Sequence, residues 1–148
     1  VIQAYLYRSI KDLKKLESSK LNLRICKGIY REPSNIAMNS RKKINENYLL
    51  LAKTTLLGKG YACIATHDME LINHLENFVE KNGISPNKFE FQVLFGVPMG
   101  NKLKHLKEKG YKVRIYVPFG EAWFDYSIRR LKENPKIISY IIGNIFKK

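Results

Sequence analysis

Hydrophobic positions along this chain fall into two alternating patterns, short strand-like runs and longer runs with helical spacing. The strand-like runs are rich in aromatic and β-branched residues and occupy residues 2–7, 21–30, 61–68, 89–96 and 111–120. Between them, apolar residues recur at the three- and four-residue spacing of an amphipathic helix. The helices expected from this spacing begin at Ser9 and then cover residues 45–60, 69–83, 101–110, 121–134 and 136–146.

Capping residues support these boundaries. Gly58 and Gly60 end the second helix, Asp68 can cap the third, and Pro135 separates the last two. The order strand, helix, strand predicts an α/β fold with a parallel sheet whose short strands are apolar on both sides. Such strands form either an open doubly wound sheet or the later strands of an eight-stranded (β/α) barrel. Length alone favours the open sheet, because a complete barrel needs about 250 residues.

Each expected strand also delivers a polar or glycine position toward its carboxyl end, where parallel α/β proteins gather their functional groups. Taken singly, each position has an ordinary structural interpretation: Gln3 and Gln92 can pair with backbone, and His67 can cap a helix. Because they recur at every strand, we expect a common binding edge made of Gln3, Arg24, Lys27, Gly28, Tyr30, Thr66, His67, Glu90, Gln92 and Tyr116.

The chemistry of this edge suggests an anionic ligand. Arginine and lysine supply cations, tyrosines supply flat faces, and Gly28 lets backbone approach a bulky group. The mixture suits a phosphate-bearing aromatic cofactor together with a small carboxylate. Arg129 and Arg130 can straddle that carboxylate near Tyr116. Equally, they can be exposed helix charges, with Arg129 paired to Glu133 one turn later.

The amino-acid composition excludes few classes of function for this protein. The 148 residues carry a formal net charge of +14, which attracts anions, acidic lipid surfaces or nucleic acid without distinguishing among them. Cys26 and Cys63 lie in apolar runs and predict buried thiols in a reducing compartment. The sequence has no GxGxxG motif, no P-loop, no metal-ligand spacing among its histidines and no apolar run of about 18 residues.

Five motifs resemble those of the proline dehydrogenase family, in order and in spacing. They are QAYLYRS, LRICKGIYREP, CIATHD, FEFQVLFG and VRIYVPFGEAWFDYSIRRLKENP, and the resemblance runs from Ile2 to the end of the chain. It is strongest with the bacterial single-function enzymes. It implies a TIM-type (β/α)8 barrel, of which this chain carries approximately strands 4–8 with their helices.

The resemblance also implies a cofactor and a set of site residues. FAD lies across the strand ends, and the matching cofactor-binding positions are Gln3, Arg24, Lys27, Gly28, Ile29, Thr66 and His67. Arg24 matches the arginine beside flavin N5 and, with Tyr116, is expected to be catalytic. The matching substrate-binding positions are Tyr30, Tyr116, Arg129, Arg130 and Glu133, with the two arginines on the carboxylate of proline.

The implied activity is FAD-dependent oxidation of L-proline to 1-pyrroline-5-carboxylate by hydride transfer from C5 to flavin N5. The implied partners are L-proline and a quinone or other electron acceptor. We expect a cytoplasmic enzyme with peripheral contact to an anionic membrane, and no nucleic-acid partner. The alternatives are a basic α/β binding module for RNA or an acidic partner, and an inactive barrel fragment.

Two departures from the family matter. Ile29 stands where the family usually has alanine, and a lysine and an aspartate from the first half of the family barrel have no counterpart here. Residues 1–148 therefore read as one proline dehydrogenase-like domain without the first barrel strands. We expect a fragment or truncated product that is inactive alone or pairs with another chain.

Overall fold

The computed structural model describes residues 1–121 except 17–19, 29, 31 and 118. The helices expected at residues 121–134 and 136–146 fall almost entirely outside the described residues. Four of the expected site residues also lie outside them: Ile29, Arg129, Arg130 and Glu133.

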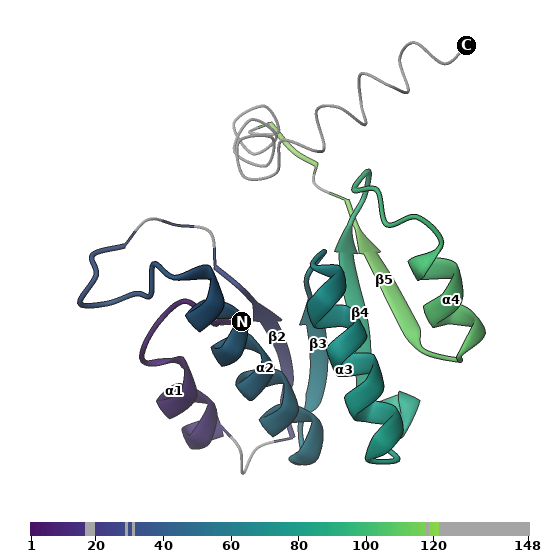
Figure 1. The fold of residues 1–148 in the computed structure, drawn as a ribbon, viewed down its shortest axis with the longest axis horizontal. Helices are drawn as coiled ribbons and strands as arrows, with labels where there is room; N and C mark the ends of the chain where they lie inside the picture. The colour runs from purple at the N-terminus through teal and green to yellow at the C-terminus, as the bar shows by residue number, and fades with distance from the viewer. Residues whose placement is uncertain (17–19, 29, 31, 118, 122–148) are drawn as a thin grey trace.

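Five parallel strands form one sheet, and four helices connect them (Figure 1). The strands are β1 (Ile2–Gln3), β2 (Asn22–Cys26), β3 (Tyr61–Ala65), β4 (Phe89–Leu94) and β5 (Lys112–Tyr116). The connections contain α1 (Ser9–Leu16), α2 (Arg41–Leu57), α3 (Met69–Lys81), the 3₁₀ turn η1 (Pro86–Lys88) and α4 (Lys102–Glu108).

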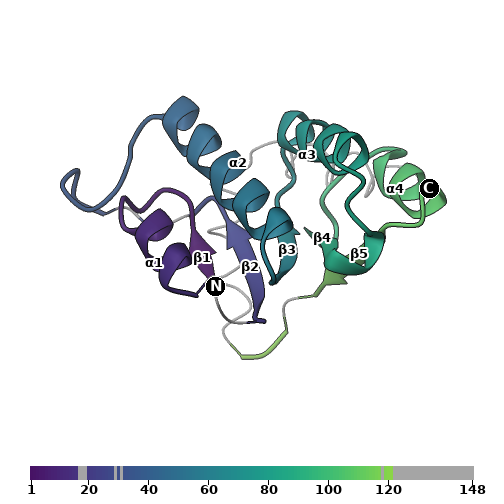
Figure 2. The ribbon, with the colours of Figure 1, turned by 90° about the horizontal axis from the view of Figure 1, so that it is seen from below.

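The strands lie in the sheet in the same order as in the chain, β1-β2-β3-β4-β5. Because parallel crossovers are right-handed, a sheet that always advances in one direction places every helix on the same side. Figure 2 shows α1 to α4 together on one side of the strands. A doubly wound sheet would need a reversal of strand order, and the described strands contain none. The described part of the chain is therefore a sector of a (β/α) barrel, as expected.

The hydrophobic core lies between the sheet and these helices. Leu23 and Ile25 of β2 and Phe91 of β4 turn toward it, and Leu51 of α2 and Ile72 of α3 pack onto them from the helical side. Tyr48 of α2 is fully buried, and its hydroxyl donates to the carbonyl oxygen of Ile25 at 3.2 Å. Burying these side chains stabilises the fold by about 1.5–3 kcal/mol each.

The opposite face of the sheet is not apolar, contrary to the prediction. Successive side chains of a strand point to opposite faces, so the residues between the core positions lie together on this second face. We call it the open face, because no described helix covers it. Its residues include Arg24, Cys26, Tyr61, Cys63, Glu90, Gln92, Arg114 and Tyr116.

The strands are also shorter than their hydrophobic patterns suggested, most clearly at the beginning. β1 ends at Gln3, and the chain then turns so that the amide of Tyr5 donates to the carbonyl oxygen of Lys27 at 2.9 Å. This turn places the ring of Tyr5 against Gly28, which has a φ of +100°. The bulky group that Gly28 admits is therefore, in this structure, a side chain of the protein itself.

Gly28→Ala should destabilise the fold strongly. A Cβ at position 28 would lie 2.1 Å from Cδ1 of Tyr5, so overpacking adds about 1–3 kcal/mol to the backbone strain. Gly110→Ala is the matched control, because Gly110 has a φ of +78° but no heavy atom within 4 Å of the position that a Cβ would occupy. Urea unfolding should therefore show a larger loss of free energy for Gly28→Ala. Equal losses would contradict the role of Tyr5.

A buried carboxylate joins α3 to α4. Glu76 of α3 is 4% exposed and accepts hydrogen bonds from Lys102, from His105 at 2.8 Å and from Lys109 at 2.8 Å. Burial opposes the charge of this carboxylate, but the three cationic or polar partners outweigh burial and lower its pKa from the usual 4.5 to about 2. This cluster holds α4 beside α3 on the helical side of the sheet.

The cluster predicts a particular acid sensitivity. Because the folded pKa of Glu76 lies below its unfolded value, its stabilisation is present above about pH 4.5 and is lost as the pH falls toward 2. Between about pH 5 and pH 2, the protein should lose up to about 3 kcal/mol more unfolding free energy than Glu76→Gln. Glu70→Gln, at an exposed position of α3, should follow the unmodified protein. Parallel pH curves for the protein and Glu76→Gln would refute this assignment.

Candidate functional site

Glu90 of β4 is the centre of a hydrogen-bond network on the open face. Its carboxylate accepts two hydrogen bonds from Arg114, at 2.6 and 2.9 Å, one from Gln92 at 2.6 Å and one from the hydroxyl of Tyr61 at 3.3 Å. Glu90 is only 3% exposed. The hydrogen bonds of Arg114 outweigh burial and lower the pKa of Glu90, so the carboxylate is ionised at neutral pH.

The same carboxylate affects its neighbours on β3. Burial, followed by the negative charge of Glu90, raises the pKa of Tyr61 to about 12 and that of Cys63 to about 11. Both groups therefore stay protonated and neutral at neutral pH. Cys63 is buried as predicted, whereas Cys26 is half-buried on the open face.

Arg24 lies at the other end of this network. Its Nε donates to Oε1 of Gln92 at 2.9 Å, and one Nη donates to Sγ of Cys26 at 2.7 Å. Its guanidinium carbon lies 5.2 Å from the ring centroid of Tyr116, the last residue of β5. The two residues expected to be catalytic, which are far apart in the sequence, are thus brought together. Among the described residues, no carboxylate accepts a hydrogen bond from Arg24.

A second cluster forms where β2 and β3 end. Oδ2 of Asp68 lies 2.6 Å from Nζ of Lys27 and 3.6 Å from a guanidinium nitrogen of Arg41. Oδ1 of Asp68 accepts from the amides of Glu70 and Leu71, which makes Asp68 the N-cap of α3, as predicted. Burial opposes the charge, but Lys27 and these amides together lower the pKa of Asp68.

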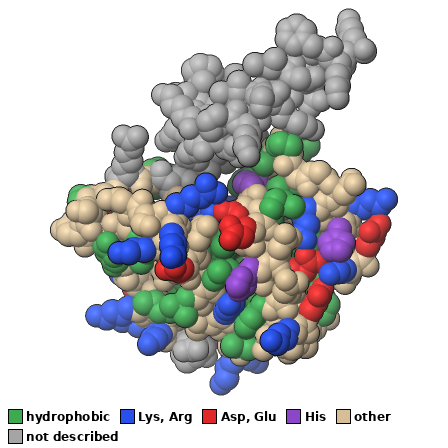
Figure 3. Space-filling view, in the orientation of Figure 1, with side chains coloured by type: hydrophobic (Ala, Val, Ile, Leu, Met, Phe, Trp, Pro, Cys, Tyr) green, Lys and Arg blue, Asp and Glu red, His purple; other side chains and the backbone are tan. Residues whose placement is uncertain are grey.

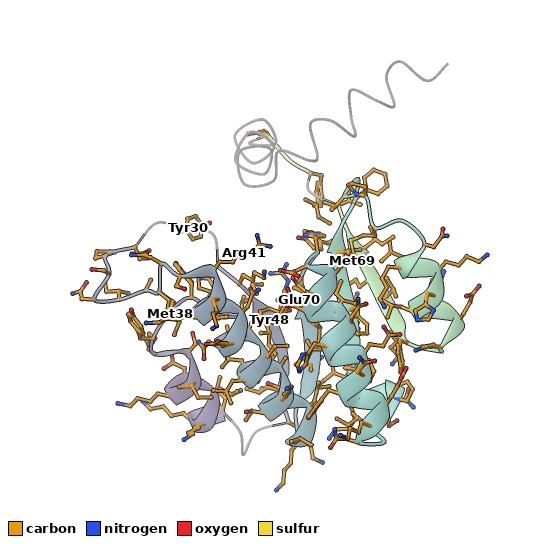
Figure 4. All side chains as sticks on the ribbon, in the orientation of Figure 1. Tyr30, Met38, Arg41, Tyr48, Met69 and Glu70 are labelled. Atoms are coloured by element: carbon orange, nitrogen blue, oxygen red, sulfur yellow. The ribbon has the colours of Figure 1, made fainter. Side chains whose placement is uncertain are left out.

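The first turn of α2 brings cationic side chains to this end of the sheet, beside the carboxylates of Asp68 and Glu70. The first turn of α2 carries Arg41, Lys42 and Lys43 and no acidic residue, although a helix N-terminus already has positive potential. Figure 4 shows Arg41 and Tyr30 at the same end of the molecule as Glu70, which lies in the first turn of α3. The cations of the first turn of α2 and the helix N-terminus are the groups at this end that would attract an anionic ligand.

Thr66 and His67 connect β3 to its surroundings at the same edge. Oγ1 of Thr66 accepts from the amide of Asp68 at 3.1 Å. Nε2 of His67 accepts a hydrogen bond from the amide of Leu94 at 2.8 Å, which links the loop after β3 to the end of β4. Nε2 therefore carries no proton in this arrangement, and any ring proton of a neutral His67 is on Nδ1.

The remaining expected site residues differ in how far their side chains are exposed to solvent. Gln3 is half-buried on β1 and pairs in register with Cys26, and its carbonyl oxygen accepts from Oγ of Ser9 at 2.5 Å. Tyr30 is 56% exposed. The ordinary structural interpretation of Gln92 was a hydrogen bond to the backbone. In the structure its amide instead forms hydrogen bonds with the side chains of Arg24 and Glu90.

Three members of the network have no assigned role in the sequence-based prediction. Glu90 and Gln92 are expected there only as polar positions of the binding edge, and Arg114 is not expected at all. Part of this network has a signal in the sequence, because Glu90 and Gln92 are two residues apart in one strand and so share a face. That Arg114 lies on the same face depends on the register of β4 and β5.

Two other kinds of site are absent from the described residues. No group of three or more His, Cys, Asp or Glu side chains in this part of the chain is arranged to hold a metal ion. Within the same residues, no helix has the length and apolar character needed to cross a membrane.

Comparison with known proteins identifies the family. A sequence model described as proline dehydrogenase matches residues 1–141. The chain belongs to the proline dehydrogenase family. Proline dehydrogenase 2 of Bacillus subtilis strain 168 is 40% identical over 148 residues, which are all of this chain and 48% of that protein. The proline dehydrogenase of Deinococcus radiodurans is 36% identical over 147 residues, 99% of this chain and 47% of that protein.

Solved structures agree with this family and with its fold. Proline utilization A (PutA) from Bdellovibrio bacteriovorus, inactivated by N-propargylglycine, superimposes with a TM-score of 0.80 at 28% identity, over 90% of this chain and 16% of that one. A bifunctional PutA matches with a TM-score of 0.77 at 24% identity, over 90% of this chain and 16% of that one, which supports the fold alone. The chain spans about half the length of the curated relatives it matches.

Asp68 provides a test of the strand-end cluster. Asp68→Asn keeps an oxygen that can cap α3 but removes the charge that pairs with Lys27 and Arg41. Asp68→Ala removes both and should cost about 1 kcal/mol more unfolding free energy than Asp68→Asn. The comparison is made by urea unfolding at low and high salt. The loss of unfolding free energy in Asp68→Asn should be smaller at high salt, because salt screens the ion pairs that this variant removes. Identical losses in the two variants would show that the cap contributes nothing.

Proposed function

We propose that this chain forms part of an FAD-dependent enzyme that oxidises L-proline to 1-pyrroline-5-carboxylate. The observation that carries the proposal is Arg24, a cation that donates to no carboxylate among the described residues and lies on the open face beside Tyr116, in a chain of this family. A cation that no carboxylate in the described residues neutralises is suited to stabilise negative charge on a bound group.

The hydrogen-bond donors among the described residues suit flavin adenine dinucleotide (FAD). Arg24 would face the electron-accepting end of the flavin, and Lys27, beside the cationic first turn of α2, would attract its phosphates. Gln3, Gly28, Thr66 and His67 lie at or next to the strand ends and would complete the cofactor site with Ile29. A bound flavin would supply the hydride acceptor, and proline would become 1-pyrroline-5-carboxylate by giving up the hydride of C5 and a proton of its ring nitrogen.

The substrate side is assigned to residues near the eighth strand of the family barrel. Arg129 and Arg130 would hold the carboxylate of proline, each through charge-assisted hydrogen bonds. Tyr116 and Tyr30 would contact the ring, and Glu133 would support the paired arginines. Fixing the carboxylate in this way would orient the C5–H bond for transfer.

A complete site requires further strands. The described sheet ends at β1 on one side and at β5 on the other, and a barrel has no edges. We therefore infer that strands equivalent to the first part of the barrel, supplied in the same or another polypeptide, cover β1 in the active enzyme. The relatives that are about twice as long are consistent with this arrangement.

The remaining assignments concern the enzyme's surroundings. A quinone or another acceptor would reoxidise the enzyme, and the net charge of +14 would favour peripheral contact with an anionic membrane from the cytoplasm. The RNA-binding alternative has little support. On the helical side, Lys and Arg side chains are dispersed among acidic ones and do not form one basic patch (Figure 3).

Flavin binding and reduction test the proposal. The protein, purified in its full natural length, should bind FAD with a visible flavin absorbance that L-proline bleaches without oxygen. Arg24→Leu should slow the bleaching by about 10²–10³-fold, because it removes a positioned positive charge. Arg8→Leu is the control, since Arg8 pairs locally with Asp12 on α1. Failure to bind FAD, or bound FAD that proline does not bleach, would overturn the proposal.

Substitution of Arg129 tests the substrate site separately. Arg129→Lys should raise the KM for proline by about tenfold or more while changing kcat little, because lysine cannot make a bidentate contact with a carboxylate. Steady-state kinetics with a dye acceptor give both constants. An unchanged KM would remove Arg129 from the substrate site without affecting the flavin assignment.

A further inference from the structure

We propose that Gln92 is a positioning residue for Arg24, held in a single orientation by Glu90, which Arg114 in turn holds in place. The inference rests on the proposed function only in that Arg24 acts beside the flavin. Its physical basis is one continuous chain of hydrogen bonds across the open face, from Arg114 through Glu90 and Gln92 to Arg24.

The hydrogen bonds determine the orientation of the amide. Arg24 can only donate hydrogen bonds, and the ionised carboxylate of Glu90 can only accept them. The observed amide presents its oxygen to Arg24 and its nitrogen to Glu90, at 2.9 and 2.6 Å. A flipped amide would place donor against donor and acceptor against acceptor. The two charged neighbours therefore select one orientation of the Gln92 amide.

Burial makes this selection effective. Glu90 and Gln92 are 3% and 7% exposed, so little water is available to replace a lost partner. An unsatisfied polar group at such a position costs about 1–3 kcal/mol, which disfavours other arrangements.

The neutrality of Gln92 matters as much as its orientation. The charge of Glu90 is already matched by the two hydrogen bonds from Arg114, and the amide separates this ion pair from Arg24. Arg24 is thereby oriented without being neutralised. A carboxylate at position 92 would instead form an ion pair with the guanidinium of Arg24 and neutralise much of its positive charge.

The contact also depends on small residues in the intervening strand. β3 lies between β2 and β4, with Cys63 in register with Arg24 and with Glu90, and Ala65 in register with Gln92. Arg24 must therefore reach over β3, a span of about 9–10 Å between the outer strands. Ala65 lies on the open face, and its small side chain leaves space for the side chain of Arg24 to cross β3. The positioning of Arg24 by Gln92 therefore also depends on the small size of Ala65.

The test follows the Nε–H group of Arg24 by ¹⁵N NMR and the midpoint potential of bound FAD, in the full-length protein. Gln92→Leu should speed exchange of the Arg24 Nε proton with water by roughly tenfold, as expected for the loss of one hydrogen bond. It should also lower kcat while leaving the KM for proline unchanged. Gln92→Glu should keep the Arg24 proton protected but lower the flavin potential, because reduced flavin would lose part of its stabilisation.

Ala65→Leu should break the same hydrogen bond between Arg24 and Gln92 in a different way. The larger side chain would block the path of Arg24 across β3 without altering a polar group. It should reproduce the proton exchange of Gln92→Leu, and far-UV circular dichroism checks that each variant folds. Unchanged exchange in both Gln92→Leu and Ala65→Leu would overturn the positioning role. Faster exchange in a protein that binds no FAD would support positioning while refuting the proposed function.

Discussion

The carboxylate of Glu90 is the group on which the polar side of the sheet depends. It is buried and ionised, and a buried charge is tolerated only when its partners are well placed. Here Arg114 from β5, Tyr61 from β3 and Gln92 from β4 itself supply those partners. Three adjacent strands are therefore tied together on the open face, and the position of Arg24 on a fourth strand, β2, follows from them.

The order of the strands explains why such a network exists. A sheet that advances in one direction receives all its helices on one side, so the other side has to be completed by polar contacts or by a ligand. The core residues and the site residues are consequently neighbours in every strand. A change at a core position of β2 or β4 is one residue away from a site position, which couples the stability of this chain to the geometry of its site.

Much of the fold could be predicted from the sequence, and the exceptions have physical reasons. The period of the apolar residues located all five strands and the four described helices, and the cap at Asp68 was identified correctly. Strand ends were overextended, because the turn at Tyr5 is fixed by hydrogen bonds to Lys27 and Met38 from distant segments, which no local pattern reveals. The meeting of Arg24 with Gln92 was also beyond the sequence, since it depends on the register of two strands that do not touch and on the small Ala65 between them. Motif resemblance, in contrast, was enough to name the family.

The open face, with Arg24 as its oriented cation, is where the flavin should bind. A crystal structure of the full-length protein loaded with FAD tests this placement most directly. The isoalloxazine ring is predicted to lie against the open face with the guanidinium of Arg24 in contact with N5 and still bonded to Gln92. A flavin bound on the helical side of the sheet, or an Arg24 turned away from the ring, would contradict it.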